Sequence, residues 1–174
     1  TAPKQKLDLM SDQGNHQGVL LAMTPYAYAT LDDLFKNAAD KGEDPFFLLL
    51  DNLEDPHNLG SILRTADASG VHGVIIPKHR AVGLTSAVAK VSTGAIEYVP
   101  VARVTNLAQT IKTRKERGMW GFGTAMDGQD YRKWDAKGST ALVIGNEGKG
   151  ISPRVAKLMD ETIAIPMVGH VQSL

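Results

Sequence analysis

The residues best suited to bind a ligand lie in a glycine-rich segment, residues 142–152, which reads Leu-Val-Ile-Gly-Asn-Glu-Gly-Lys-Gly-Ile-Ser. Its glycines allow positive φ and let a ligand lie against bare main chain. Glu147 is the only carboxylate in the segment. The segment therefore predicts a ligand site with one acidic group. A plain turn from strand to helix fits the same residues, and Glu147 would then serve only the helix dipole.

Two common glycine motifs for nucleotide binding do not fit this sequence. A phosphate-binding loop needs Lys and then Ser or Thr after its last glycine, whereas Ile151 follows Gly150. A dinucleotide fingerprint beginning at Gly121 also fails, because Met126 occupies its third small position. A ligand at residues 142–152 must therefore be bound in another way.

A second polar segment, residues 55–64, adds an amide and a cation, and with residues 165–174 it completes a predicted catalytic cofactor site. Asn58 lies at or near the start of a predicted helix. Arg64 follows about one and a half to two turns later, so both side chains can face one pocket. The alternatives are that Asn58 only caps the helix and that Arg64 is an ordinary surface residue.

Short apolar runs and amphipathic stretches alternate along the chain and predict the frame that positions these segments. Residues 46–50 and 141–144 are unbroken apolar runs, which is typical of strands buried on both faces of a parallel sheet. Strands are predicted at residues 16–23, 46–50, 74–77, 98–103, 120–125, 141–144 and 162–166. Helices are predicted from the cap Thr30 to near Gly42, at 59–69, at 85–91, from the cap Thr105 to Gly118, and at 153–159 after the cap Ser152.

This alternation predicts an α/β fold, with a parallel sheet and helices on both of its faces. The carboxyl ends of parallel strands meet at one edge, where open α/β sheets bind ligands. The loops that begin at residues 51 and 145 should therefore face each other. Residues 126–138 are predicted to form a loop, and Trp120 is expected to pack in the core.

Composition narrows the class of protein. The 174 residues include no cysteine, and the five histidines have no metal-ligand spacing, so we expect neither disulfides nor a metal. No apolar run approaches the ~20 residues of a membrane span, and we expect a cytoplasmic protein. The formal net charge of +0 does not itself indicate nucleic-acid binding. Basic clusters either form one face or lie scattered on solvated helices; they occupy residues 78–80, 112–117, 132–133 and 149–157.

Three motifs, taken together, resemble those of one family of RNA-modifying enzymes. They are Asp55-Pro-His-Asn58 with Arg64, Ile144-Gly-Asn-Glu-Gly148, and Ile165-Pro-Met167 with Ser173-Leu174. In order and spacing they are similar to the motifs of the SpoU (TrmH) branch of the SPOUT methyltransferases. The similarity is closest to the bacterial 23S ribosomal RNA guanosine 2′-O-methyltransferases and covers residues 46–174.

The resemblance implies a parallel-sheet SPOUT (α/β-knot) domain over residues 16–174, with a trefoil knot near its carboxyl terminus. Residues 1–15 would be the linker from an RNA-binding domain upstream. The family's third motif continues past its Ser-Leu pair, whereas this sequence stops at Leu174. We therefore expect a knot that is truncated here, its remaining residues being missing or disordered. A homodimer is also implied.

For the site, the resemblance implies S-adenosylmethionine as the cofactor and methyl transfer to a ribose 2′-hydroxyl of RNA, with ribosomal RNA favoured. Because the pKa of a guanidinium exceeds ~12, we expect Arg64 to bind phosphate and stabilise the 2′-oxyanion rather than to accept the proton. The proton acceptor is left open. The implied catalytic residues are Asn58, Arg64, Glu147 and Ser173, and the implied cofactor-binding residues are Thr124, Gly145, Asn146, Gly148, Ile165, Met167 and Leu174.

Three other functions fit the sequence in part. The same chemistry could act on transfer RNA. A module that binds RNA without catalysis would show no affinity for S-adenosylmethionine. A nucleotide-binding regulator of flavodoxin-like type would instead bind a phosphorylated ligand at residues 145–150.

Overall fold

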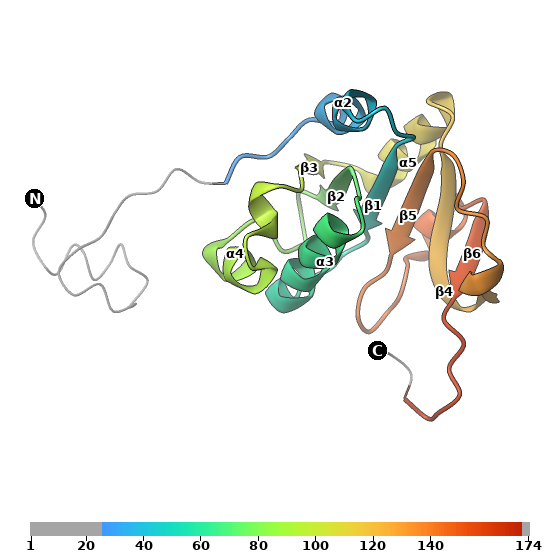
Figure 1. The fold of residues 1–174 in the computed structure, drawn as a ribbon. Coiled ribbons are helices and arrows are strands. Elements are labelled where there is room, and N and C mark those ends of the chain that lie inside the picture. The colour runs from blue at the N-terminus through green and yellow to red at the C-terminus, as the bar shows by residue number, and fades with distance from the viewer. Residues whose placement is uncertain (1–25, 172–174) are drawn as a thin grey trace, which may run out of the picture.

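Residues 26–171 are described by a computed structural model, and their fold is built on one parallel sheet. The sheet has six strands in the order β3-β2-β1-β5-β4-β6, and all of their pairings are parallel (Figure 1). This confirms the predicted α/β class. The strands are β1 (Phe46–Leu50), β2 (Gly73–Pro77), β3 (Val101–Val104), β4 (Trp120–Asp130), β5 (Thr140–Ile144) and β6 (Glu161–Ala164).

Helices cover both faces of the sheet, as predicted (Figure 1). On one face pack α3 (Pro56–Ala68), α4 (Ser86–Ser92) and the 3-10 turn η1 (Ala95–Glu97). The other face is covered by α2 (Leu31–Asp40), α5 (Leu107–Glu116) and the short α6 (Pro153–Ala156), while η2 (Tyr131–Lys133) follows β4.

Strand β1 shows why its sequence is an unbroken apolar run. Leu48 and Leu50 pack into the core under α3, whereas Phe47 and Leu49 pack into the core under α2 and α5. Because a strand points successive side chains to opposite faces, both sets are buried only when both faces are covered. Each such side chain contributes ~1.5–3 kcal/mol by leaving water.

The helix caps agree with the sequence in part. Thr30 and Asp33 form a reciprocal capping box at the start of α2, and Thr85 caps α4. The cap of α5 is Asn106 rather than Thr105, because the side chain of Asn106 accepts the Gln109 N–H at 3.0 Å. Ser152 occupies the cap position of α6 without a side-chain hydrogen bond, and this helix is shorter than predicted.

Strand boundaries differ most where pairing is non-local. The strand predicted at 98–103 is Val101–Val104, because the N–H groups of Tyr98 and Val99 both donate to the carbonyl of Ala95 in the turn that closes η1. Strand β4 continues to Asp130 through the predicted loop, since its last residues pair with β6 after an irregularity between Thr124 and Gln129.

Trp120 is 59% exposed at the first position of β4, so its predicted place in the core is wrong. The strand predicted at 16–23 lies outside the described residues.

Neither a helix able to span a membrane nor a group of metal ligands is found among residues 26–171. None of the helices between residues 26 and 171 is both long and apolar enough to cross a bilayer. Within the same range, no three side chains of His, Asp or Glu come together in a group that could hold a metal ion. The predicted knot stays a prediction, because no observation on residues 26–171 tests it.

Candidate functional site

Two loops meet at the carboxyl edge of the sheet, where β1 and β5 lie side by side. The first, residues 51–55, follows β1; the second, residues 145–152, follows β5 and is called the glycine loop below. Asn146 Nδ2 donates to the carbonyl oxygen of Asn52 at 2.8 Å. The carboxylate of Asp51 accepts the Ser152 N–H at 2.7 Å. The two loops are therefore tied together near both ends of the glycine loop, as their predicted placement requires.

The glycine loop is closed by its own hydrogen bonds. The N–H of Asn146 donates to the carbonyl of Gly150, and the N–H of Gly150 donates to the carbonyl of Asn146, both at 3.0 Å. The side-chain oxygen of Asn146 accepts the N–H groups of Gly148 and Lys149 at 2.9 and 3.1 Å. The loop is therefore a preformed hairpin, closed by the main chain of Asn146 and Gly150 and filled by the side chain of Asn146.

The glycines of the loop have different roles. Gly150 has a φ of 68°, the left-handed conformation that glycine adopts without strain. Gly145 has no positive φ, but a Cβ there would lie 2.3 Å from the carbonyl carbon of Gly150. Gly148 has room for a Cβ, whose nearest neighbour would be 3.7 Å away. Only Gly145 and Gly150 are therefore required by the backbone, for close approach and for positive φ.

The amides of the glycine loop are mostly used within the protein. Those of Asn146, Gly148, Lys149, Gly150 and Ser152 all donate to protein oxygens. A phosphate-binding nest instead presents successive free N–H groups to its anion. A phosphorylated ligand would have to displace these bonds, which argues against the flavodoxin-like regulator.

The start of α3 contacts the glycine loop through Glu147. Asn58 Nδ2 donates to Glu147 Oε1 at 3.1 Å, and the N–H of Asp55 donates to the same oxygen at 3.3 Å. Asp55 caps α3, so Asn58 is free for this contact and does not act as the cap. The structure thus brings together two of the predicted catalytic residues, which are 89 positions apart in the chain.

Glu147 is held in its ionised form. Partial burial would raise the pKa of its carboxyl, but hydrogen bonds from its own N–H, from Asn58 and from the N–H groups of Asp55 and Glu54 outweigh burial and lower the pKa below 4.5. A carboxylate with a lowered pKa is a weak base at neutral pH. Glu147 is therefore suited to orient donors at this edge rather than to accept a proton.

We expect Glu147→Gln to lower the free energy of unfolding at pH 7 and this difference to disappear in acid. Because the folded pKa of Glu147 lies below its ordinary value of 4.5, its contribution is fully present above that pH and is lost as the pH falls through the folded pKa. Urea unfolding of both proteins between pH 7 and pH ~3 measures the difference. A gap that stays constant across this range would contradict the assignment.

Arg64 lies in the third turn of α3 with an exposed side chain. It is six residues beyond Asn58, which places the two about 120° apart around the helix. Within residues 26–171 it forms no hydrogen bond or ion pair, so the structure does not join it to Glu147. Its catalytic role stays a prediction.

The remaining predicted cofactor residues lie on β4 and after β6, at the same edge. Thr124 donates its hydroxyl to the carbonyl of Val143 in β5 at 3.3 Å and is paired with Ile163 of β6. Ile165 and Met167 follow β6 and are 56% and 37% exposed. Ser173 and Leu174 lie outside the described residues. Exposed apolar side chains at this edge of the sheet are consistent with the walls of a site for a flat, partly apolar ligand.

Sequence reasoning missed Asp51 and Asn52. Asp51 is only 4% exposed and fixes the end of the glycine loop, whereas Asn52 offers its carbonyl to Asn146 from a φ of 60°. The position of Asp51 could have indicated its role. It directly follows a buried strand at the ligand-binding edge, and a buried carboxylate there needs a hydrogen-bond donor.

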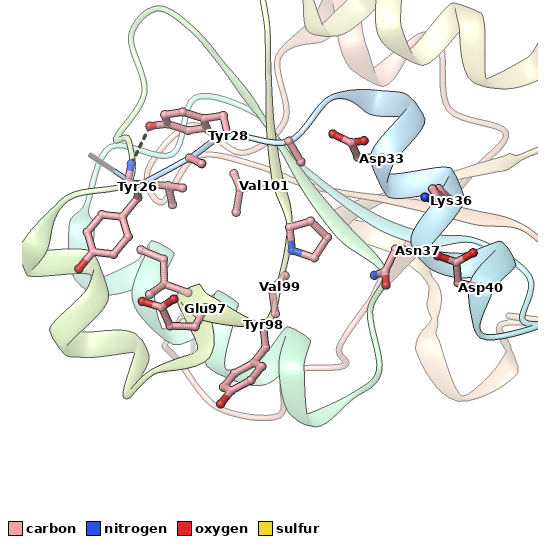
Figure 2. A pocket seen from close by; sticks show the side chains of 15 residues that line it. Tyr26, Tyr28, Asp33, Lys36, Asn37, Asp40, Glu97, Tyr98, Val99 and Val101 are labelled. Carbon is pink, nitrogen blue, oxygen red and sulfur yellow. Dashed lines mark hydrogen bonds between the residues drawn. The ribbon is translucent and has the colours of Figure 1, made fainter. Parts of the chain in front are cut away.

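A separate hollow of about 540 Å³ lies away from this edge, between residues 26–29, α2 and residues 96–101 (Figure 2). The hydroxyl of Tyr28 accepts the Leu84 N–H at 2.8 Å beside it. Its lining includes none of the predicted site residues. Three carboxylates and one lysine line it, which disfavours phosphate; they are Asp33, Asp40, Glu97 and Lys36.

Comparisons with known proteins place the chain among RNA methyltransferases. Residues 45–174 match the model of the SpoU rRNA Methylase family, and residues 1–29 match that of a domain described as RNA 2′-O ribose methyltransferase substrate binding. A Bacillus subtilis relative named as a TrmH family tRNA/rRNA methyltransferase, YacO, is 59% identical over 99% of this chain and 69% of its own length. The domain boundary expected at residue 15 stays a prediction.

Two solved structures share the fold. The SpoU methyltransferase AviRb from Streptomyces viridochromogenes, in complex with AdoMet, is 34% identical over 75% of this chain, with a TM-score of 0.69. An AdoMet-bound rRNA methyltransferase from Sinorhizobium meliloti is 28% identical over 85% of this chain, with a TM-score of 0.73. The chain spans about half the length of these two proteins, 52% and 55%.

Proposed function

Because this chain belongs to the SpoU rRNA methylase family, we propose that it transfers a methyl group from S-adenosylmethionine to the 2′-hydroxyl of a ribose in RNA. The observation that carries the proposal is the preformed glycine loop, tied to the loop after β1 and to Asn58 at one edge of the sheet. The proposed target is a guanosine of 23S ribosomal RNA, and the enzyme is proposed to act in the cytoplasm as a homodimer.

The residues at this edge fit S-adenosylmethionine better than a phosphorylated ligand. The missing side chain of Gly145 makes room for the main chain of Gly150 and Ile151, which shapes the loop, and the loop keeps few amides for an anion. Ile165 and Met167 offer exposed apolar side chains after β6, and Thr124 lies on the neighbouring strand β4. Asn146, Gly148 and Leu174 complete the proposed cofactor set. When bound, the cofactor supplies an electrophilic methyl group.

The chain's own groups must then deal with the charge that develops on the ribose. The 2′-hydroxyl loses its proton as the bond to the methyl group forms, so a cation near the oxygen stabilises the transition state. Arg64 is proposed for this role, with Asn58, Glu147 and Ser173 orienting the substrate. Neither Arg64 nor the ionised Glu147 is a good proton acceptor. The proton of the 2′-hydroxyl therefore goes to water or to a phosphate oxygen of the RNA.

Arg64→Ala is expected to lower kcat at least ~100-fold while the Kd for S-adenosylmethionine stays within about twofold, because the lost interaction forms only with the reacting ribose. Single-turnover methyl transfer and calorimetry measure the two quantities. Arg64→Lys should recover little, since an ammonium lacks the bidentate geometry. Lys112→Ala is the control, because Lys112 is exposed on α5, which covers the face of the sheet opposite to α3. This variant should leave both quantities unchanged. Near-normal turnover of Arg64→Lys would refute bidentate orientation.

The function itself is tested with the full-length protein, labelled S-adenosylmethionine and total unmodified RNA, followed by mass mapping of the labelled nucleotide. Label in a 2′-O-methylguanosine of 23S ribosomal RNA is expected. Label in transfer RNA would support the second candidate, which the tRNA/rRNA name of the Bacillus relative favours. RNA binding without cofactor affinity would support a catalytically impaired module. A fully active monomer in analytical ultracentrifugation would refute the proposed homodimer.

A further inference from the structure

The loop between β2 and α4, residues 78–85, lies at the same edge as the glycine loop. The N–H of Lys78 donates to the carbonyl of Val104 at the end of β3, at 2.9 Å. The N–H of Val82 donates to the carbonyl of Leu53 at 3.0 Å, and Leu53, 4% exposed, belongs to the loop after β1. Residues 78–82 are therefore anchored beside the loop that leads to Asp55, which itself contacts Glu147.

The side chains of Lys78, His79 and Arg80 are all exposed in this loop. In the part of the chain that the structure describes, neither Lys78 nor Arg80 is paired with a carboxylate. The cluster at residues 149–157 also forms no ion pair among the described residues, whereas cations of the clusters at residues 112–117 and 132–133 are paired. Those pairs are Arg114 and Lys115 with Asp160, Arg117 with Asp32, and Arg132 with Asp130. Lys78 and Arg80 therefore lie at the predicted catalytic edge with no ion pair among the described residues.

Arg80 also adopts an uncommon backbone conformation. Its φ is 53°, in the left-handed region that a side chain other than glycine rarely occupies. The anchors at Lys78 and Val82 hold it there. A strained, exposed cation beside a predicted active site suggests that a demand other than folding keeps arginine at this position.

We propose that Lys78 and Arg80 bind backbone phosphates of the RNA next to the ribose that is methylated. This inference rests on the proposed function. The chain has a net charge of +0, and Glu147 is ionised at the same edge, so a polyanion needs local cations to approach it. Lys78 and Arg80 supply two such charges on an anchored segment, whereas residues of the glycine loop and α3 serve the cofactor and the ribose.

The test measures binding of full-length protein to an unmodified 23S ribosomal RNA transcript as salt rises from about 50 to 200 mM. Lys78→Ala and Arg80→Ala should each weaken binding several-fold at low salt. Each should also reduce the slope of log K against log salt by ~0.7–0.9, the value for one lost phosphate contact. Lys41→Ala is the matched control, because this exposed lysine precedes β1 and so lies at the opposite edge. Its slope should equal that of the wild type.

Arg80→Gly separates binding from folding. Glycine relieves the left-handed strain, so the urea midpoint should stay the same or rise, while RNA binding weakens as much as in Arg80→Ala. If the wild-type protein methylates RNA but Lys78→Ala and Arg80→Ala both keep its salt slope, this proposal is overturned and the proposed function is not. A wild-type protein that binds RNA but transfers no methyl group, and whose two alanine variants still show reduced slopes, would overturn the proposed function and leave the phosphate contacts of Lys78 and Arg80 standing. A wild-type protein that binds no RNA would overturn both.

Discussion

Replacing Gly145 by alanine is expected to weaken S-adenosylmethionine binding at least ~100-fold, a loss of ~2.7 kcal/mol. The added Cβ would lie 2.3 Å from the carbonyl carbon of Gly150 and 2.4 Å from the nitrogen of Ile151. Both are backbone atoms of the hairpin, so the clash cannot be relieved by a side-chain rotation. The strand end and the hairpin must separate, which disturbs the surface proposed to receive the cofactor. Calorimetric titration with S-adenosylmethionine measures the effect.

Gly148→Ala is the matched control in the same loop. Its Cβ would lie 3.7 Å from the side-chain oxygen of Asn146, an ordinary contact, and Gly148 has no positive φ. Its Kd should remain within about threefold of the wild type. Circular dichroism distinguishes loss of the site from loss of the fold in Gly145→Ala. A folded Gly145→Ala protein with the same Kd as Gly148→Ala would show that the cofactor does not lie against this loop.

Arg114→Met is expected to lower the free energy of unfolding by ~3 kcal/mol, because it removes one partner of a largely buried ion pair. Arg114 is 5% exposed, and its guanidinium donates to Asp160 at 3.1 Å. It also donates to the carbonyls of Met119 and Leu158 at 2.7 and 2.8 Å. One side chain thus connects α5, the start of β4 and the crossover into β6. Urea unfolding followed by circular dichroism measures the loss.

Arg117→Met is the control for this change, because Arg117 is the cap residue directly after α5 and the substitution is of the same size. Arg117 pairs with Asp32 at 2.7 Å, but both side chains are exposed, 43% and 81%. Exposed ion pairs contribute ~0–1 kcal/mol, so the control should lose less than about 1 kcal/mol. Equal losses in the two variants would mean that burial of Arg114 and its three acceptors does not determine the effect.

The sheet was predictable where local sequence and tertiary structure agree. Residues 46–50 and 141–144 are apolar runs, and both became central strands buried on two faces. The far end of β4 was not predictable, since Met126 to Asp130 has no alternating pattern. Its strand geometry depends on pairing with Ile163 and Ala164, more than thirty residues later. Such pairing is a property of the assembled sheet and leaves no local signal.

The site was predicted as a meeting of segments but not in its detail. The parallel sheet placed Asn58 and Glu147 at one edge, and the structure shows them in contact. The bond from Ser152 to Asp51 spans 101 positions and uses a buried carboxylate whose partner cannot be deduced from spacing. Arg64 shares α3 with Asn58, yet helix geometry turns it away from that contact, which periodicity alone could have indicated.

The closed hairpin of residues 146–150 has a consequence for turnover. Its two main-chain bonds and the bonds to the side chain of Asn146 exist before any ligand arrives, so the entropy of ordering these residues is lost during folding and not during association. When the demethylated product is exchanged for a new molecule of S-adenosylmethionine, this segment does not have to fold again. The time that the cofactor stays bound would then depend on its own contacts with the protein. A difference in affinity between S-adenosylmethionine and its demethylated product would appear as a difference in dissociation rate.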